Sequence, residues 1–309
     1  MSDPLEASGA AAGDAPRSRR VRIGTVETRD GAQLSWRVDG AGPLPPFLCS
    51  NGLGVATFFW RHIADHFGQA RPVITWDYRG HGQSPVPPDP ESMTVAQCAR
   101  DLWAVADAVG AVRPILLGHS MGCQVLLEAT RLQPARPSAL VPMLGVAGKA
   151  LASFIGGERL DPLIRVVSEL GAARPELVSQ LTRRILSLPG IWPAVKALGF
   201  VHPDLCPREE FVPYFEHLAQ LDFRGYWALV RDLLSHDASD LLAGLRLPVL
   251  VVAGERDRFT PMRRSEEMAA AIPGAELLVV PGGSHAALVE QPELIQLALG
   301  KFLRLRALA

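Results

Sequence analysis

The sequence predicts an α/β fold with a mostly parallel sheet of eight strands flanked by helices. Short apolar runs alternate with longer amphipathic segments along most of the chain, which is typical of strands and helices that follow one another in such a sheet. The inner apolar runs lack alternating polar residues, as expected for strands that helices cover on both faces. With 309 residues, 48% hydrophobic and 20% charged, the chain can bury a large core without disulfides or metals.

The apolar runs that we interpret as strands are short and end at turn or loop residues. The first two join through Asp30-Gly31, a turn signal. The expected strands are Arg20–Glu27, Gln33–Val38, Pro46–Ser50, Val73–Trp76, Ile115–Leu117, Leu140–Leu144, Pro248–Ala253 and Glu276–Val280.

Helices are expected between these strands, and several carry start or stop signals. Apolar residues spaced four apart follow Phe59, and Gly68 is positioned to cap that helix at its C-terminus. Thr94 and Gln97 form a capping box for the next helix, which Gly110 stops. Further helices are expected after Ser120, after Thr260-Pro261 and at the C-terminus.

The pattern changes between the sixth and seventh strands. Residues 148–240 are helical in pattern, rich in aromatic residues, and contain no convincing buried strand. We therefore expect a disordered tail at 1–17, a first core segment at 18–147, a helical cap at 148–240 and a second core segment at 241–309.

Charge and hydropathy restrict the classes of partner. The net charge is −1 and no basic stripe is present, which argues against nucleic acid and against an anionic membrane surface as partners. No apolar run is long enough to span a bilayer, and the N-terminus lacks the apolar core of a signal peptide. We expect a cytoplasmic monomer or homodimer.

The cysteines and the phosphate-binding motifs bear on cofactors. Cys49, Cys98, Cys123 and Cys206 form no C-x-x-C pair, so no metal or redox site is predicted. Free thiols in a reducing compartment are favoured, although the even count leaves a disulfide as the alternative. Neither a phosphate-cradling loop nor a dinucleotide fingerprint is present, so no cofactor is predicted.

The feature that points most directly to chemistry is Gly118-His119-Ser120-Met121-Gly122, between an apolar strand and an amphipathic helix. This is the G-x-S-x-G nucleophile elbow in its proper context. The serine must stand on a tight, strained turn, where side chains at Gly118 and Gly122 would collide with neighbouring backbone. The N-terminus of the following helix favours negative charge developing at the site.

A serine hydroxyl needs a base, and the base needs a carboxylate. His285 follows the last strand, and Asp257 ends the strand before it, so both should reach the C-terminal edge of the sheet near Ser120. The chain order Ser, acid, His also fits this type of triad. Glu255 and Asp237 compete with Asp257 for the role of the acid.

The oxyanion formed by attack on a carbonyl requires hydrogen-bond donors. The backbone N–H of Met121 should supply one, and that of Leu53 the other, because Gly52 and Gly54 let the backbone come close.

Five segments in this order resemble the α/β-hydrolase superfamily, in its branch of small esterases, lactonases, perhydrolases and carbon–carbon bond hydrolases. They are Asn51-Gly52-Leu53-Gly54, Asp77-Tyr78-Arg79-Gly80-His81-Gly82-Gln83-Ser84, the elbow at Ser120, Gly254-Glu255-Arg256-Asp257 and Gly283-Ser284-His285. The resemblance covers roughly residues 20–305. It implies that Asp77 and Arg79 serve a turn through hydrogen bonds rather than take part in catalysis. Many relatives carry His at the position of Asn51. This difference weakens inference about the substrate by analogy more than inference about the triad.

The resemblance also implies that residues 148–240 form a lid over Ser120. The aromatic content suggests an apolar roof and a small, neutral, moderately apolar ester or lactone as substrate. The alternative is that the aromatic residues only attach the lid to the core. His119 belongs to the elbow, and its side chain should point away from the serine. The candidate substrate-binding residues are Phe58, Trp60, His119, Trp192, Tyr214 and Trp227.

The leading hypothesis is ester or lactone hydrolysis through an acyl-enzyme. Carbon–carbon bond hydrolysis, perhydrolysis and acyl transfer to another acceptor would use the same triad. Epoxide hydrolysis and dehalogenation are disfavoured, since relatives that perform them carry Asp at the position of Ser120. A ligand receptor without catalysis is the rival from another class.

Overall fold

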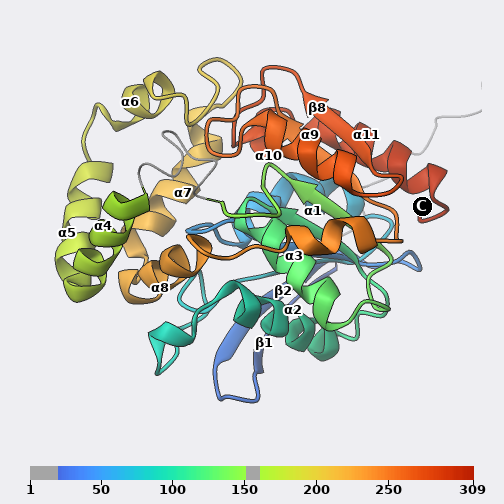
Figure 1. Cartoon of the computed structure of the whole chain (residues 1–309), viewed down its shortest axis with the longest axis horizontal. Helices are drawn as coiled ribbons and strands as arrows, with labels where there is room; N and C mark the ends of the chain where they lie inside the picture. Colours follow the sequence, from blue (N-terminus) through green and yellow to red (C-terminus); the bar gives the residue numbers. More distant parts are fainter. Residues whose placement is uncertain (1–19, 151–160) are drawn as a thin grey trace, which may run out of the picture.

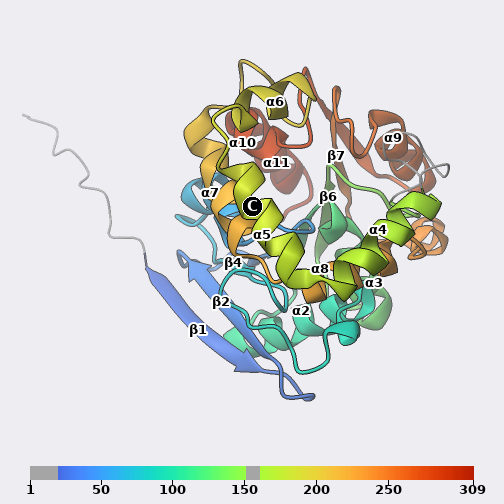
Figure 2. The same ribbon diagram turned by 90° about the vertical axis from the view of Figure 1, so that its left-hand side faces the viewer.

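The structure is a computed structural model that describes residues 20–150 and 161–309. The expected tail at 1–17 and residues 151–160 of the expected cap lie outside this range. The described residues form an eight-stranded sheet of order β1-β2-β4-β3-β5-β6-β7-β8 (Figures 1 and 2). The strands are β1 Val21–Glu27, β2 Gln33–Asp39, β3 Phe47–Ser50, β4 Val73–Trp76, β5 Ile115–His119, β6 Ala139–Met143, β7 Leu250–Gly254 and β8 Glu276–Val280.

The sheet is mostly parallel, which confirms the predicted fold class. β2 pairs antiparallel with β1 and β4, and every other pairing is parallel. All eight strands lie where the sequence predicts them, with ends that differ by at most two residues. The prediction for β5 ended at Leu117, but the strand continues because Gly118 pairs with Ser50 of β3 and His119 with Met143 of β6.

Helices cover both faces of the sheet and explain the uniformly apolar inner strands. In β5, Leu116 packs into a core cluster with α2 Val95–Val109, α3 Met121–Leu132 and α9 Met262–Ala271. Its neighbours Ile115 and Leu117 pack into the opposite cluster with helices of the other face. These helices are α1 Arg61–Phe67, α10 Ala287–Glu290 and α11 Pro292–Leu305. Because successive side chains enter different clusters, both faces of β5 are apolar from Ile115 to Leu117.

The capping signals are confirmed in part. Thr94 Oγ1 accepts a hydrogen bond from Gln97 N at 3.1 Å, and Gly110 ends α2 with φ 74°. The Gln97 side chain does not complete the capping box, because it donates to Asp101 Oδ1 at 2.8 Å instead. Gly68 caps α1 with φ −61°, a conformation that does not require glycine.

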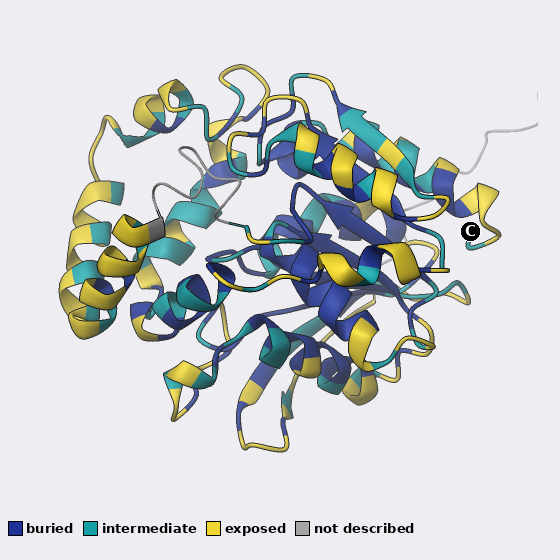
Figure 3. Ribbon diagram, viewed as in Figure 1, coloured by how far each residue is buried: buried dark blue, intermediate teal, exposed yellow. Residues whose placement is uncertain are grey.

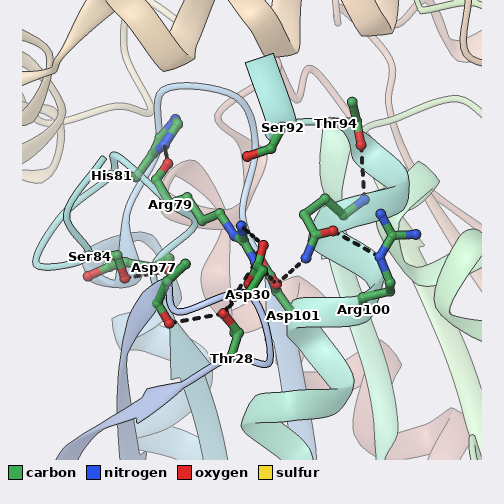
Figure 4. A network of polar contacts seen from close by, with 12 residues as sticks. Thr28, Asp30, Asp77, Arg79, His81, Ser84, Ser92, Thr94, Arg100 and Asp101 are labelled. Atoms are coloured by element: carbon green, nitrogen blue, oxygen red, sulfur yellow. Dashed lines mark hydrogen bonds and ion pairs between the residues drawn. The ribbon is translucent and has the colours of Figure 1, made fainter. Parts of the chain in front are cut away.

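Asp101 belongs to a buried polar network that fixes the loop after β4 (Figure 4). The guanidinium of Arg79 donates to Asp101 on α2 at 2.7 and 2.8 Å and to Asp30, in the turn between β1 and β2, at 2.6 and 3.0 Å. Hydrogen bonding to Arg79 holds the pKa of Asp30 well below its ordinary value. Asp77 accepts from the backbone N–H groups of Thr57 and Gln83, each at 3.0 Å. The hydrogen bonds of Asp77 and Arg79 thus hold backbone segments together.

Helices also lie between β6 and β7, on the left in Figure 1, and this is the region where the pattern of the sequence changes. They are α4 Asp161–Ala173, α5 Pro175–Leu186, α6 Ile191–Ala197, α7 Arg208–Gln220 and α8 Phe223–Leu233. α4 contacts α8, and α5 contacts both α7 and α8. The outer faces of α4 and α5 are largely exposed (Figure 3), including Leu170 and Leu181.

The described residues contain no helix long and apolar enough to cross a membrane. All four cysteines are buried and free, as predicted.

Candidate active site

Ser120 stands on a strained turn between β5 and α3. Its φ of 55° and ψ of −118° are unusual for a residue with a side chain. A Cβ at Gly118 would lie 2.4 Å from Gly122 O, and a Cβ at Gly122 would lie 2.3 Å from Ser50 O. Glycine at 118 therefore lets β5 approach α3, and glycine at 122 lets α3 approach β3.

The structure brings together Ser120, His285 and Asp257. His285 Nε2 lies 3.0 Å from Ser120 Oγ, and His285 Nδ1 lies 2.8 Å from Asp257 Oδ2. Asp257 is buried, and its carboxylate also accepts hydrogen bonds from the backbone N–H of Phe259 at 2.8 Å and from the backbone N–H and hydroxyl of Thr260 at 2.9 and 2.8 Å. Because the Asp257 carboxylate is an acceptor, His285 donates a hydrogen bond from Nδ1. Its Nε2 is then free to accept a hydrogen bond from the Ser120 hydroxyl.

The electrostatics of Asp257 favour its charged form. Burial raises the pKa of this carboxyl. The charge of His285 and the hydrogen bonds from His285 and Thr260 lower the pKa by more than burial raises it, so it lies below its ordinary value. The competing acids lie elsewhere. Glu255 is exposed and accepts from Gly282 N at 2.7 Å, and Asp237 accepts from Ser239 N at 2.9 Å.

The two expected oxyanion donors are available. The backbone N–H groups of Leu53 and Met121 have no acceptor among the residues that the structure describes. A Cβ at Gly52 would lie 3.1 Å from Ser120 Cβ, so the backbone before Leu53 lies against the serine. Gly54 N donates to His81 Nε2 at 3.2 Å, which fixes the far side of this loop.

Asn51 holds the base of the same loop. Its Nδ2 donates to Trp76 O and its Oδ1 accepts from Trp60 Nε1, both at 2.8 Å, while Tyr78 Oη donates to its backbone oxygen at 2.7 Å. This position requires one side-chain donor and one side-chain acceptor, and the amide of Asn51 supplies both. The prediction that Trp60 binds substrate is corrected here, because its bond to Asn51 draws the indole into the core, where it is fully buried.

A cavity of about 650 Å³ opens above Ser120. Its floor includes Leu53, Ser120, Met121 and His285, and side chains from α4 to α8 line the opposite wall. The aromatic side chains in its lining are Phe59, Phe200, Phe211, Tyr214, Phe215, Tyr226, Trp227 and Phe259.

Only some of the predicted substrate-binding residues line this cavity. Tyr214, Trp227 and His119 do, but Phe58 and Trp192 do not. The ring of Trp192 packs on Phe211 and Phe215, with the Lys196 ammonium 5.3 Å from its centroid, so it attaches α6 to α7. The ring of Phe58 lies 6.1 Å from that of His217 and packs against the core.

His119 lines the cavity, but its side chain is held by the loop that carries His285. Its Nε2 lies 3.0 Å from the backbone oxygen of His285. Burial, together with the nearby His285, lowers the pKa of His119 to about 3, so the neutral ring donates from Nε2 to that oxygen. The side chain thereby supports the backbone at His285.

Sequence reasoning missed three residues of the site. Thr260, three residues after Asp257, donates hydrogen bonds from its backbone N–H and its hydroxyl to the Asp257 carboxylate. Glu290 is buried and accepts from Ser284 N at 2.9 Å, from Ser284 Oγ at 2.5 Å and from His202 N at 2.6 Å, which fixes the loop that carries His285. Gln124, one helical turn after Ser120, lines the cavity. Polar residues recur along α3 at Glu128, Thr130 and Arg131, so Gln124 gave no separate signal in the sequence.

No group of three or more His, Cys, Asp or Glu side chains among the described residues could hold a metal ion.

Comparisons with known proteins agree with this fold. A family model described as the alpha/beta hydrolase fold matches residues 45–292. A protein of Caulobacter vibrioides named "Putative carbamate hydrolase RutD" is 30% identical over 294 aligned residues, covering 92% of this chain and 98% of that protein. The "3-oxoadipate enol-lactonase 1" of Acinetobacter baylyi is 27% identical over 268 residues, covering 87% and 92%. The solved structure of a thermophilic esterase from Thermogutta terrifontis superposes with a TM-score of 0.72 at 23% identity, covering 92% and 99%, and shares the fold.

Proposed function

The chain belongs to the α/β-hydrolase family, and from this premise we propose that it is a serine hydrolase of a carboxylic ester or lactone. The substrate is small and moderately apolar, and the reaction passes through an acyl-enzyme on Ser120. The observation that carries the proposal is the continuous hydrogen-bonded chain from Ser120 through His285 to Asp257, beneath a largely apolar cavity.

The proposed reaction follows from the positions of these groups. His285 Nε2 takes the proton of Ser120 Oγ as the oxygen attacks the carbonyl carbon of the substrate. The N–H groups of Leu53 and Met121 bind the resulting oxyanion. His285 then gives its proton to the leaving alcohol, while Asp257 stabilises the imidazolium. A water molecule, deprotonated by the same histidine, attacks the acyl-enzyme, and Ser120 recovers its proton when the acid leaves.

Carbamate hydrolysis is the second candidate, supported by the name of the Caulobacter vibrioides relative. A carbamate also has a carbonyl that Ser120 could attack. A large apolar cavity favours the ester over a small, polar carbamate. Carbon–carbon bond cleavage, perhydrolysis and acyl transfer remain alternatives that share the first half of the reaction.

The test is a single-turnover assay with p-nitrophenyl esters of graded acyl length, comparing the wild type with Ser120→Ala. We expect a burst of nitrophenol and a mass increase of one acyl group on Ser120 in the wild type, and neither in the variant. A folded wild-type protein that shows no burst with any ester would contradict ester hydrolysis.

Product analysis separates the alternatives. Release of the free acid in water supports hydrolysis. A peracid formed with peroxide, or a new ester formed with an added alcohol at a higher rate than the free acid, would assign the acyl-enzyme to another acceptor. Faster turnover of a phenyl carbamate than of the matched ester would favour the second candidate.

A further inference from the structure

The helical side of the cavity, formed by side chains from α4 to α8, is almost entirely apolar. Leu, Ile, Val, Phe, Tyr and Trp make up this side, and among the described residues only two of its side chains expose a polar atom. They are Tyr214 on α7 and Tyr226 on α8. Neither hydroxyl takes part in the proposed reaction.

Trp227 is the third side chain on the helical side with a polar group, and this group is not available to a ligand. Its indole N–H is buried, and a Cβ at Gly171 would lie 2.3 Å from Nε1, so the nitrogen faces the backbone of α4. The two tyrosine hydroxyls differ. Neither has a hydrogen-bond partner within the described parts of the chain, and neither is among the polar atoms closed off from solvent. Both oxygens are therefore open to a ligand.

Both hydroxyls lie deep in the protein. Burial raises the pKa of Tyr226 to about 12, and burial together with the nearby Tyr226 raises the pKa of Tyr214 above its ordinary value. Because both residues line the cavity, the open surface of each oxygen faces the cavity rather than the outside of the molecule. At neutral pH both phenols are protonated, so each can donate a hydrogen bond.

The packing of α7 and α8 brings the two tyrosines to one part of the cavity. Tyr214 and Leu218 are one helical turn apart on α7, and both line the cavity. A Cβ at Gly54 would lie 3.2 Å from Leu218 Cδ2 and 3.4 Å from Tyr226 Cε2, so Tyr226 lies beside Leu218. Tyr226 is therefore above the loop of the proposed oxyanion donor Leu53, and Tyr214 is one turn away along α7.

We propose that Tyr214 and Tyr226 bind a second carbonyl oxygen of the substrate, separate from the scissile carbonyl, and that each hydroxyl donates a hydrogen bond to it. A carbonyl oxygen has two lone pairs and can accept from both. A buried tyrosine hydroxyl usually has a partner, and here only the contents of the cavity can supply one. This inference rests on the proposed function and deepens it, because it names the substrate class: esters or lactones that carry a further ketone-type or amide-type carbonyl.

A carboxylate is the other oxygen acceptor that two phenols could bind. In this cavity it would lose its water without meeting a cation, because no Lys or Arg side chain of the described residues lines the cavity. A neutral carbonyl loses less on leaving water, and two donated hydrogen bonds satisfy it. We therefore assign the pair of hydroxyls to an uncharged carbonyl and use a carboxylate of the same length as the contrasting probe.

The experiment measures kcat/KM for p-nitrophenyl octanoate and for its 4-oxo, 5-oxo, 6-oxo and 7-oxo derivatives, which place a ketone at successive positions of the acyl chain. Hexyl butanoate and its 4-oxohexyl and 5-oxohexyl counterparts test the alcohol portion through release of butanoic acid. The variants Tyr214→Phe, Tyr226→Phe and the double variant each keep the rings and remove only oxygen. Ser187→Ala, a hydroxyl deletion at the exposed end of α5 outside the cavity, is the matched control.

The readout is the ratio of each ketone ester to its all-carbon ester within one variant, so effects common to both esters cancel. For at least one ketone position, this ratio in the wild type and in Ser187→Ala should exceed the ratio in the double variant by about tenfold, because two neutral hydrogen bonds are lost there. Each single variant should lose about threefold. The p-nitrophenyl monoester of suberic acid, which carries a free carboxylate, should react about tenfold or more slowly than the octanoate in every variant.

Ratios that agree within about twofold between the wild type and the double variant, at every ketone position in both series, would overturn the role of the hydroxyls. A carboxylate ester that reacts faster than the octanoate in the wild type, and loses this advantage in the double variant, would overturn the uncharged acceptor. Both results leave ester hydrolysis intact, whereas a folded protein that forms no acyl-enzyme with any of these esters contradicts the proposed function itself. Should the double variant fail to fold, the two single variants decide by the same ratios.

Discussion

The two walls of the cavity are held in different ways. On the sheet side, Ser120, His285 and Asp257 are fixed by short hydrogen bonds, and Thr260 and Glu290 fix the backbone around them. On the helical side, aromatic rings pack against one another along each helix, as in the edge-to-face contacts of Phe211 with Phe215 on α7 at 5.2 Å and of Tyr226 with Trp227 on α8 at 5.3 Å. Hydrogen bonds tolerate little displacement, whereas apolar contacts allow side chains of similar volume to replace one another.

This difference separates chemistry from selectivity. Substitutions on the sheet side should abolish turnover of every substrate, because the proposed reaction requires each reacting atom to stay within hydrogen-bond distance of the next. Substitutions on the helical side should change which substrates react. The predictions below test this separation, beginning with the largest expected effect.

Among substitutions on the sheet side, replacing Asp257 with Asn should cause the largest loss of activity. The amide cannot stabilise the imidazolium and favours the wrong tautomer of His285, so kcat should fall by about 10⁴-fold with every ester. Glu255→Gln is the matched control, because Glu255 is exposed and accepts a hydrogen bond from Gly282 N, away from His285. Steady-state kinetics with folded protein provide the measurement. Equal losses in the two variants would mean that the acid is misassigned.

Replacing Glu290 with Gln should loosen the same side without touching a reacting atom. The carboxylate accepts three hydrogen bonds, two of them from Ser284, and an amide can replace only part of them. A displaced His285 should lower kcat by about 10²-fold, with KM changing much less. Glu293→Gln, at the first turn of α11, is the control. A loss confined to KM would argue against a positioning role.

Acid should destabilise both walls. Burial lowers the pKa of His81 to about 4, of His119 to about 3 and of His217 to about 4, from an ordinary value of 6.5. Below pH 6.5 the unfolded chain therefore binds more protons than the folded chain, and the free energy of unfolding falls as the pH falls toward 4.

Each of these histidines contributes a slope of up to about 1.4 kcal/mol per pH unit in that window. Urea unfolding at pH 7, 5.5 and 4.5 measures the slope, and His217→Gln should flatten it because one of the three buried rings is gone. An identical slope in the wild type and the variant would show that His217 does not titrate on unfolding.

Replacing Trp227 with Phe should change the helical side only. The smaller ring enlarges the cavity, so the preferred acyl length should increase and kcat/KM for short esters should fall by about tenfold or less. Trp192→Phe is the matched control, since Trp192 packs on Phe211 outside the cavity. The esters of graded length give the readout. A tenfold or larger loss in kcat for all lengths alike would remove the distinction between the walls.

Much of the sheet side could be predicted from the sequence, because it depends on local rules. Apolar runs located all eight strands, and the glycines at 118 and 122 located the strained turn at Ser120. The order of loops along a parallel sheet placed the candidates Asp257 and His285 at the same edge. The sequence favoured Asp257 over Glu255 and Asp237, and in the structure Asp257 lies next to His285.

Tertiary structure alone decided the rest, because contacts between residues far apart in the chain leave no periodic signal. Trp60 is in the core because its N–H meets the amide of Asn51, and Trp192 faces Phe211 rather than the cavity. Glu290 meets His202 across 88 positions of sequence. By itself, the sequence determined the fold class and the candidates for the reacting groups, since the positions of strands, helices and tight turns along the chain follow from local patterns. The lining of the cavity was decided only when helices from the second half of the chain packed over the elbow.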